Sequence, residues 1–125
     1  MTPKPITVYV IDDDESIRKA LKRLLRSVGY HVVTFDSGED FLDFAPEGGE
    51  GCLVLDIRLS GMTGLELYER LYGSGAKYSV ILMTAHDCPQ WRERAKKAGA
   101  VAYLRKPFPE QFLLDAIRHA CDRKS

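Results

Sequence analysis

Short apolar runs alternate with amphipathic segments along the whole chain, and this alternation limits the possible folds more than any other feature. Five runs have the length of a β-strand: 6–11, 30–35, 52–55, 80–83 and 101–104. Segments with helical spacing of apolar residues follow them: 15–28, 38–45, 64–72, 90–98 and 110–121. Strands that alternate with helices within one domain predict an open parallel sheet.

The runs at 52–55 and 80–83 are apolar at every position instead of alternating with polar residues. This pattern is typical of strands that are covered by helices on both faces of a parallel sheet. We therefore predict an α/β fold of the (βα)5 type. It is a doubly wound, five-stranded parallel sheet with the flavodoxin-like strand order 2-1-3-4-5.

The segment 15–28 shows most clearly why a helix is expected. Its apolar residues recur at helical spacing: Ile17, Leu21, Leu24, Leu25 and Val28. Its basic residues take the opposite face: Arg18, Lys19, Lys22, Arg23 and Arg26. Asp14 is suited to cap the start of this helix, and Gly29 to end it.

The length and charge balance set broad limits on function. A chain of 125 residues is long enough to bury one core, so we expect a single domain, 1–125. The 18 Lys and Arg residues are balanced by 18 Asp and Glu residues. Because a nucleic-acid-binding domain usually carries a basic excess, we expect no direct contact of this domain with nucleic acid.

Cysteine usage and hydropathy indicate the compartment. Cys52, Cys88 and Cys121 are odd in number and form no CxxC pair, which argues against a disulfide framework or a zinc site. No apolar run reaches the roughly 18 residues that a membrane-spanning helix needs. We therefore predict a cytoplasmic protein that does not insert into a membrane.

Polar residues with distinctive chemistry follow the predicted strands. Asp12 and Asp13 follow the first strand, and Asp56 follows the third. Thr84 follows the fourth strand, and the fifth leads to Lys106. Parallel α/β sheets bind ligands beyond the carboxyl ends of their strands, at the point where the strand order reverses. We therefore expect these five residues to share one crevice between the first and third strands.

Three carboxylates in one crevice need compensating positive charge. Oxygen ligands without His or Cys favour a hard divalent cation, and room for water and a phosphoryl oxygen favours Mg²⁺. Lys106 adds a fixed positive charge, and Thr84 adds a hydroxyl donor. A carboxylate nucleophile, a metal and a lysine are what phosphoryl transfer requires, and Asp56 is the best candidate for the nucleophile.

The same residues form recognisable motifs: VIDDDE at 10–15, LVLD at 53–56, LMTA at 82–85 and KPF at 106–108. Together they resemble the signature of the receiver domain of bacterial two-component response regulators, which has the CheY-like fold. Within that family the chain is most similar to the FixJ-type branch, as judged from DIR at 56–58, TAH at 84–86 and AGAV at 98–101.

The resemblance implies a role for each site residue. Asp56 is expected to accept a phosphoryl group from the phosphohistidine of a sensor histidine kinase. The Mg²⁺ ligands are expected to be Asp13, Asp56 and the main-chain carbonyl of Arg58, with Asp12 acting through water. The resemblance also implies that Thr84 and Lys106 contact the phosphoryl group.

The family pattern also implies a switch. Tyr103 would be the aromatic partner of Thr84, although plain core packing is the alternative for a tyrosine in an apolar run. Phosphorylation is expected to change the surface formed by the fourth helix, the fifth strand and the fifth helix, which would meet an output domain or a second copy of the chain. Arg58 and His86 would tune dephosphorylation, or are solvated loop residues.

These expectations describe a signalling domain and not an enzyme, because it would catalyse only its own phosphorylation and slow dephosphorylation. Its output is expected to be transcriptional. No output domain follows Ser125 in this chain, so the sequence predicts either a single-domain regulator or the receiver part of a longer transcription factor.

Three other functions fit parts of the sequence. A phosphatase of the haloacid-dehalogenase type would use Asp12 of the pair Asp12 and Asp14 as nucleophile, but 125 residues leave little room for a cap. A flavin carrier has the same architecture, but its phosphate would be repelled by the acidic residues 12–15. A binding module that is never phosphorylated would have no need for the complete set of site residues.

Overall fold

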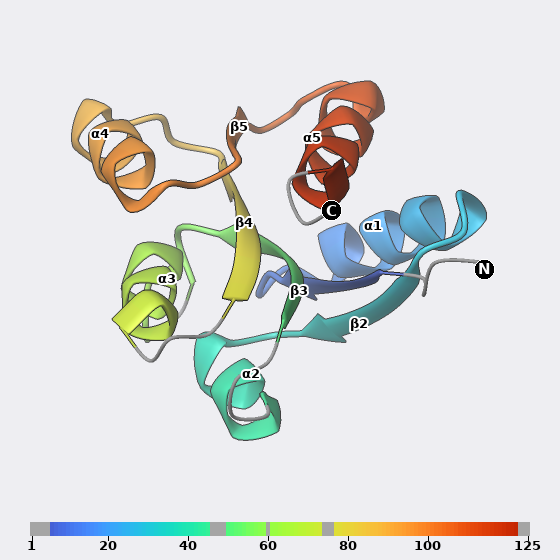
Figure 1. Cartoon of the computed structure of the whole chain (residues 1–125), viewed down its shortest axis with the longest axis horizontal. Helices are drawn as coiled ribbons and strands as arrows, with labels where there is room; N and C mark the ends of the chain where they lie inside the picture. The colour runs from blue at the N-terminus through green and yellow to red at the C-terminus, as the bar shows by residue number, and fades with distance from the viewer. Residues whose placement is uncertain (1–5, 46–49, 60, 74–76, 123–125) are drawn as a thin grey trace.

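The computed structural model describes residues 6–45, 50–59, 61–73 and 77–122. Five parallel strands form one sheet in the order β2-β1-β3-β4-β5, which confirms the predicted topology (Figure 1). The strands are β1 (Thr7–Ile11), β2 (His31–Phe35), β3 (Glu50–Asp56), β4 (Lys77–Thr84) and β5 (Ala102–Arg105). The helices are α1 (Glu15–Ser27), α2 (Gly38–Phe44), α3 (Gly64–Gly73), α4 (Pro89–Ala98) and α5 (Glu110–Asp122).

The helices cover both faces of the sheet, with α1 and α5 on one side and α2, α3 and α4 on the other (Figure 1). Strand β3 shows why its sequence is continuously apolar. Cys52 and Val54 pack in the core under α1 and α5, whereas Leu53 and Leu55 pack in the core under the other three helices. Both faces of the strand are therefore buried, as the sequence predicted.

Helix α1 begins and ends close to the predicted residues. The Asp14 carboxylate accepts hydrogen bonds from the main-chain N–H groups of Ser16 and Ile17, which makes Asp14 the N-cap. Gly29 has φ of +99°, the left-handed conformation expected just beyond a helix. Val28 was expected on the apolar face but is 50% exposed. It follows the last helical residue, so its side chain no longer falls on the buried stripe.

The strand register brings the polar strand ends to one edge of the sheet. Ile11 pairs with Leu55, Asp56 with Met83, and Thr84 with Arg105. The residues that immediately follow β1 therefore lie beside the last residue of β3. Within the part of the chain that the structure describes, no helix is long and apolar enough to cross a membrane.

Candidate functional site

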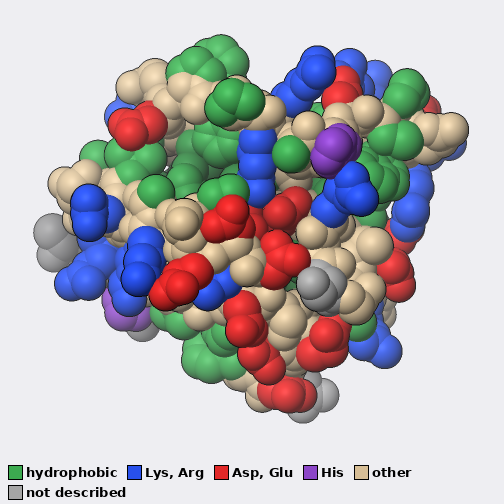
Figure 2. All heavy atoms as spheres, turned by 180° about the vertical axis from the view of Figure 1, so that it is seen from behind, with side chains coloured by type: hydrophobic (Ala, Val, Ile, Leu, Met, Phe, Trp, Pro, Cys, Tyr) green, Lys and Arg blue, Asp and Glu red, His purple; other side chains and the backbone are tan. Residues whose placement is uncertain are grey.

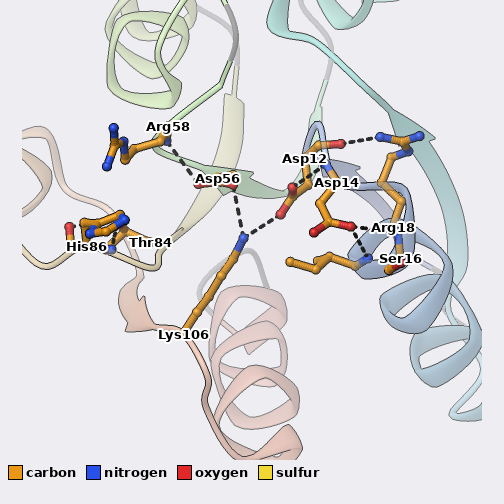
Figure 3. A network of polar contacts seen from close by, with 10 residues as sticks. Asp12, Asp14, Ser16, Arg18, Asp56, Arg58, Thr84, His86 and Lys106 are labelled. Carbon is orange, nitrogen blue, oxygen red and sulfur yellow. Dashed lines mark hydrogen bonds and ion pairs between the residues drawn. The ribbon is translucent and has the colours of Figure 1, made fainter.

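The five residues predicted at the strand ends lie in one region of the structure. Figure 3 shows Asp12, Asp56 and Lys106 converging from β1, β3 and the segment after β5. The side chains of Asp12 and Thr84 are fully buried, and Asp56 is 7% exposed. Asp13 is exposed at the rim, but carboxylate oxygens of Asp12, Asp13 and Asp56 all lie within 4.8 Å of one another.

Lys106 links the two buried carboxylates. Its Nζ donates to Asp12 Oδ2 at 2.7 Å and to Asp56 Oδ2 at 3.1 Å. If all three aspartates are ionised, one ammonium group leaves two negative charges without compensation in a largely buried place. A divalent cation would supply the missing charge, and carboxylate oxygens are the ligands that hard cations prefer. The donor set therefore fits a metal ion of this class.

Burial governs the protonation of this cluster. Burial, followed by the negative charge of Asp12, raises the pKa of Asp56 above its ordinary value, and the Lys106 ammonium opposes this only in part. Burial by itself would lower the pKa of Lys106, but hydrogen bonds and charge from Asp12 and Asp56 raise it on balance. Lys106 is therefore a permanent cation at neutral pH.

The loop between β3 and α3 fixes the carboxylate of Asp56. The main-chain N–H of Arg58 donates to Asp56 Oδ1 at 3.0 Å, and the Ile57 N–H donates to the Met83 carbonyl at 2.9 Å. A Cβ atom at Gly64 would stand 2.4 Å from the Asp56 carbonyl oxygen. Only glycine therefore allows the start of α3 to approach the end of β3 this closely.

Thr84 and Tyr103 are each engaged with the loop after β4. The Thr84 hydroxyl donates to the main-chain carbonyl of His86 at 3.0 Å and accepts from the His86 N–H at 3.1 Å. Tyr103 is half-buried against the core under α3 and α4, and its hydroxyl donates to Asp87 Oδ1 at 3.2 Å. The Arg92 guanidinium lies 5.6 Å from the centre of the Tyr103 ring and also pairs with Asp87.

Three residues that hold this region together were not singled out from the sequence: Arg18, Gly64 and Asp87. Arg18 was placed on the polar face of its helix, yet its Nη1 donates to the main-chain carbonyl of Asp12 at 2.7 Å. Asp87 lies in the loop between β4 and α4 and was not named in the sequence analysis. Two features of the sequence could have pointed to these roles. Arg18 lies one helical turn after the acidic motif, and Gly64 stands at the start of a predicted helix.

The molecular surface agrees with an acidic site. Figure 2 shows Asp and Glu side chains gathered in the centre of the face turned away from the viewer in Figure 1, with Lys and Arg side chains around them. Such a face attracts cations and disfavours anionic ligands that bring no metal with them.

Comparison with known proteins agrees with this geometry. Residues 8–118 match the family model of the response regulator receiver domain. The chain is 41% identical over 114 residues to the transcriptional regulatory protein TdiR of Thauera aromatica, an alignment that covers 91% of this chain and 50% of TdiR. It is 38% identical over 123 residues to the transcriptional regulatory protein FixJ of Azorhizobium caulinodans, covering 98% of this chain and 58% of FixJ. The crystal structure of FixJ-N matches with a TM-score of 0.86 at 36% identity, covering 98% of this chain and 96% of that chain.

The chain thus spans 50% and 58% of the length of these two curated relatives. The family match covers the motifs at all the strand ends, including Asp12, Asp56, Thr84 and Lys106. It favours a signalling module over the haloacid-dehalogenase and flavin-carrier alternatives. The chain belongs to the response regulator receiver domain family.

Proposed function

We propose that Asp56 is the phosphoacceptor of this receiver domain and takes its phosphoryl group from the phosphohistidine of a sensor histidine kinase. The observation that carries this proposal is the placement of Asp56. Asp56 is the last residue of a buried central strand, and its carboxylate lies 3.1 Å from the Lys106 ammonium. Carboxylate oxygens of Asp56, Asp12 and Asp13 lie within 4.8 Å of one another. A nucleophile, a cation and a metal-binding pair are the parts that phosphoryl transfer needs.

In the proposed reaction a carboxylate oxygen of Asp56 attacks phosphorus, the P–N bond to the kinase histidine breaks, and an acyl phosphate forms on Asp56. Lys106 is placed to neutralise charge on the transferred group. Asp13, Asp56 and the carbonyl of Arg58 would hold Mg²⁺, and Asp12 would act through water. When bound, Mg²⁺ supplies positive charge that stabilises the phosphoryl oxygens.

The signal would leave the site through Thr84 and Tyr103. A phosphoryl group brings roughly 1.5 to 2 negative charges and strong acceptor oxygens. It would draw the Thr84 hydroxyl away from His86, and Tyr103 would leave Asp87 and turn inward. The α4-β5-α5 surface would change as a result, with a coupling free energy of about 1 to 3 kcal/mol.

Receiver domains of response regulators work with histidine kinases and output domains. Two of the relatives are transcriptional regulatory proteins by name. We infer that the α4-β5-α5 surface of this chain controls a transcriptional output or pairs with a second copy, and that any DNA contact is made by another domain. The proposed site of action is the cytoplasm.

The phosphoacceptor proposal is tested with acetyl phosphate and Mg²⁺. One phosphoryl group that is stable in acid and labile in base is expected on the parent protein, and none on Asp56→Asn. Asp13→Ala should lose Mg²⁺ binding and phosphorylation together. Lys106→Ala should keep Mg²⁺ binding but weaken the coupling to the switch. Undiminished labelling of Asp56→Asn would overturn the assignment.

The switch has its own test. Beryllofluoride with Mg²⁺ mimics the phosphoryl group, and Trp91 lies half-buried in the first turn of α4, where its fluorescence should report the change. We expect a response in the parent and a weaker one in Thr84→Ala. An unresponsive parent with an occupied site would contradict the switch. An equal response in Thr84→Ala would contradict only the Thr84 route.

A further inference from the structure

Arg18 differs from the other basic residues of α1 in where its side chain goes. The others are exposed: Lys19, Lys22, Arg23 and Arg26. Arg18 is half-buried, and its Nη1 lies 2.7 Å from the main-chain carbonyl oxygen of Asp12 (Figure 3). One residue of the helix is thus tied directly to the end of β1, beside the acidic cluster.

The Arg18 bond completes the fixation of Asp12. The Asp12 main-chain N–H donates to the Phe35 carbonyl at 3.2 Å. Its carboxylate accepts from the Asp14 N–H at 2.9 Å and from Lys106 at 2.7 Å. With the carbonyl held by Arg18, both main-chain groups and both carboxylate oxygens of Asp12 have partners.

The bond from Arg18 has a consequence for Asp13 that the other bonds lack. The Asp12 carbonyl and the Asp13 N–H belong to the same planar peptide unit. A guanidinium that fixes the carbonyl therefore fixes the orientation of the whole unit and the point from which the Asp13 side chain departs. The Asp13 carboxylate must meet Asp56 within the 4.8 Å cluster, so this orientation matters for the metal ligands.

We propose that Arg18 is a positioning residue of the metal site, whose guanidinium fixes the Asp12–Asp13 peptide so that both carboxylates face Asp56. The inference rests on the proposed function, because it concerns the Mg²⁺ site that phosphorylation of Asp56 requires. Arg18 itself is not proposed as a ligand of the metal or as a contact of the phosphoryl group. It acts through the main chain of Asp12.

The positive charge of Arg18 would act in the opposite direction. A cation near the site disfavours binding of a second cation by Coulomb repulsion. If charge were the main effect of Arg18, its removal would strengthen Mg²⁺ binding. If positioning is the main effect, its removal weakens Mg²⁺ binding. We expect the positioning effect of Arg18 to outweigh its repulsion of Mg²⁺. A charge-assisted hydrogen bond is strong, whereas repulsion between partly exposed groups is screened by water and salt.

The test compares Mg²⁺ affinity in the parent, Arg18→Met and Arg23→Met, measured by following backbone amide resonances during a Mg²⁺ titration. Methionine keeps an unbranched apolar stem while it removes the charge and the donors. Arg23→Met is the matched control, because Arg23 is an exposed residue of the same helix. The same spectra report whether each variant is folded.

We expect the Mg²⁺ dissociation constant of Arg18→Met to rise by about tenfold, the range known for residues that orient metal ligands. Arg23→Met should stay within about twofold of the parent, as expected for a screened charge. Arg18→Lys keeps the charge without the planar fork, so its dissociation constant should fall between those of the parent and Arg18→Met. The largest changes in amide resonances should include Asp12 and Asp13.

Two results would overturn the inference while leaving the proposed function intact. One is an Arg18→Met dissociation constant equal to that of Arg23→Met, and the other is a value below that of the parent. A parent that binds no Mg²⁺ would overturn the proposed function and this inference together. If Arg18→Met does not fold, Arg18→Lys decides the matter, because a value equal to that of the parent contradicts the positioning role.

Discussion

Asp56 carries a negative charge in a place where ionisation is unfavourable unless a cation is near. Burial and the charge of Asp12 raise its pKa, and Lys106 offsets this only in part. As pH rises, the carboxyl of the unfolded chain therefore ionises before that of the folded protein. The folded state then loses stability relative to the unfolded state until Asp56 itself has ionised.

Replacement of this carboxylate is therefore expected to stabilise the Mg²⁺-free protein. At neutral pH, Asp56→Asn should have a higher free energy of unfolding than the parent, as measured by urea denaturation. This difference in the free energy of unfolding should be absent below the ordinary pKa of an aspartate. It should grow as the pH rises from that pKa to the raised pKa of Asp56 in the folded state. An equal difference at all pH values would contradict this explanation.

Added Mg²⁺ provides a control for the comparison of the parent with Asp56→Asn. If Mg²⁺ binds the folded state through Asp56 and its neighbours, as proposed, added Mg²⁺ should stabilise the parent by mass action. Asp56→Asn lacks one of the carboxylates and should gain less. The stability advantage of the variant should therefore shrink as Mg²⁺ is added.

Two helices show how whole elements support the site. The start of α3 packs against the end of β3 at Gly64, where an added Cβ would lie 2.4 Å from the Asp56 carbonyl oxygen and 3.0 Å from Ile57 Cα. The start of α4 is tied to β5 through Asp87, Arg92 and Tyr103. The far end of α4 is anchored to α3, because the Tyr68 hydroxyl donates to the Ala98 carbonyl at 2.6 Å.

Gly64→Ala should destabilise the protein by roughly 1 to 3 kcal/mol, the usual cost of inserting a methyl group into a fully packed position. Because the strained contact is with Asp56 itself, Mg²⁺ affinity should fall as well. Gly73→Ala, in the last turn of the same helix, is the control. A Cβ atom there meets nothing within 4 Å, so this change should be neutral or slightly stabilising. Equal stability of the two variants in urea would contradict the packing argument.

Asp87→Ala should lower the free energy that is needed to reach the switched conformation. It removes the acceptor of the Tyr103 hydroxyl and the partner of Arg92, so less free energy is needed to release Tyr103. By linkage, beryllofluoride with Mg²⁺ should bind more tightly, by about fivefold if the lost bond contributes about 1 kcal/mol. Trp91 fluorescence gives the binding curve.

Glu69→Ala is the control for Asp87→Ala. Glu69 pairs with Arg94 between α3 and α4 and has no bond to Tyr103. Its removal should leave the affinity for the mimic close to that of the parent. Tighter binding in Glu69→Ala but not in Asp87→Ala would place the control of α4 at its contact with α3, contrary to the proposal.

The sequence predicts the topology of the domain because it combines two independent patterns. Continuous apolar runs indicate strands that are buried on both faces, and helical periodicity indicates the elements between them. The boundaries of β3 and β4 were less accurate. The sequence placed these strands at 52–55 and 80–83, whereas they begin at Glu50 and Lys77. Their first residues pair within the sheet through the main chain, which leaves no apolar signal.

The site was predictable to the extent that it depends on topology. Parallel strands end at one edge, so residues at strand ends meet there whatever the intervening loops do. The supporting contacts were not predictable in the same way. Helical periodicity puts Arg18 on the polar face, and only the path of the loop after β1 brings the Asp12 carbonyl within its reach. The need for glycine at position 64 likewise appears only when α3 is packed against β3.

The identity of the carboxylate that receives the phosphoryl group has a direct chemical test. The protein is phosphorylated with acetyl phosphate and Mg²⁺ and then treated with borohydride, which reduces an acyl phosphate to an alcohol and so converts the modified aspartate to homoserine. Peptide mass spectrometry then locates the converted residue. We expect homoserine at position 56 alone, and only when both acetyl phosphate and Mg²⁺ were present. Homoserine at position 12 or 13 instead would contradict the assignment of Asp56 as the phosphoacceptor.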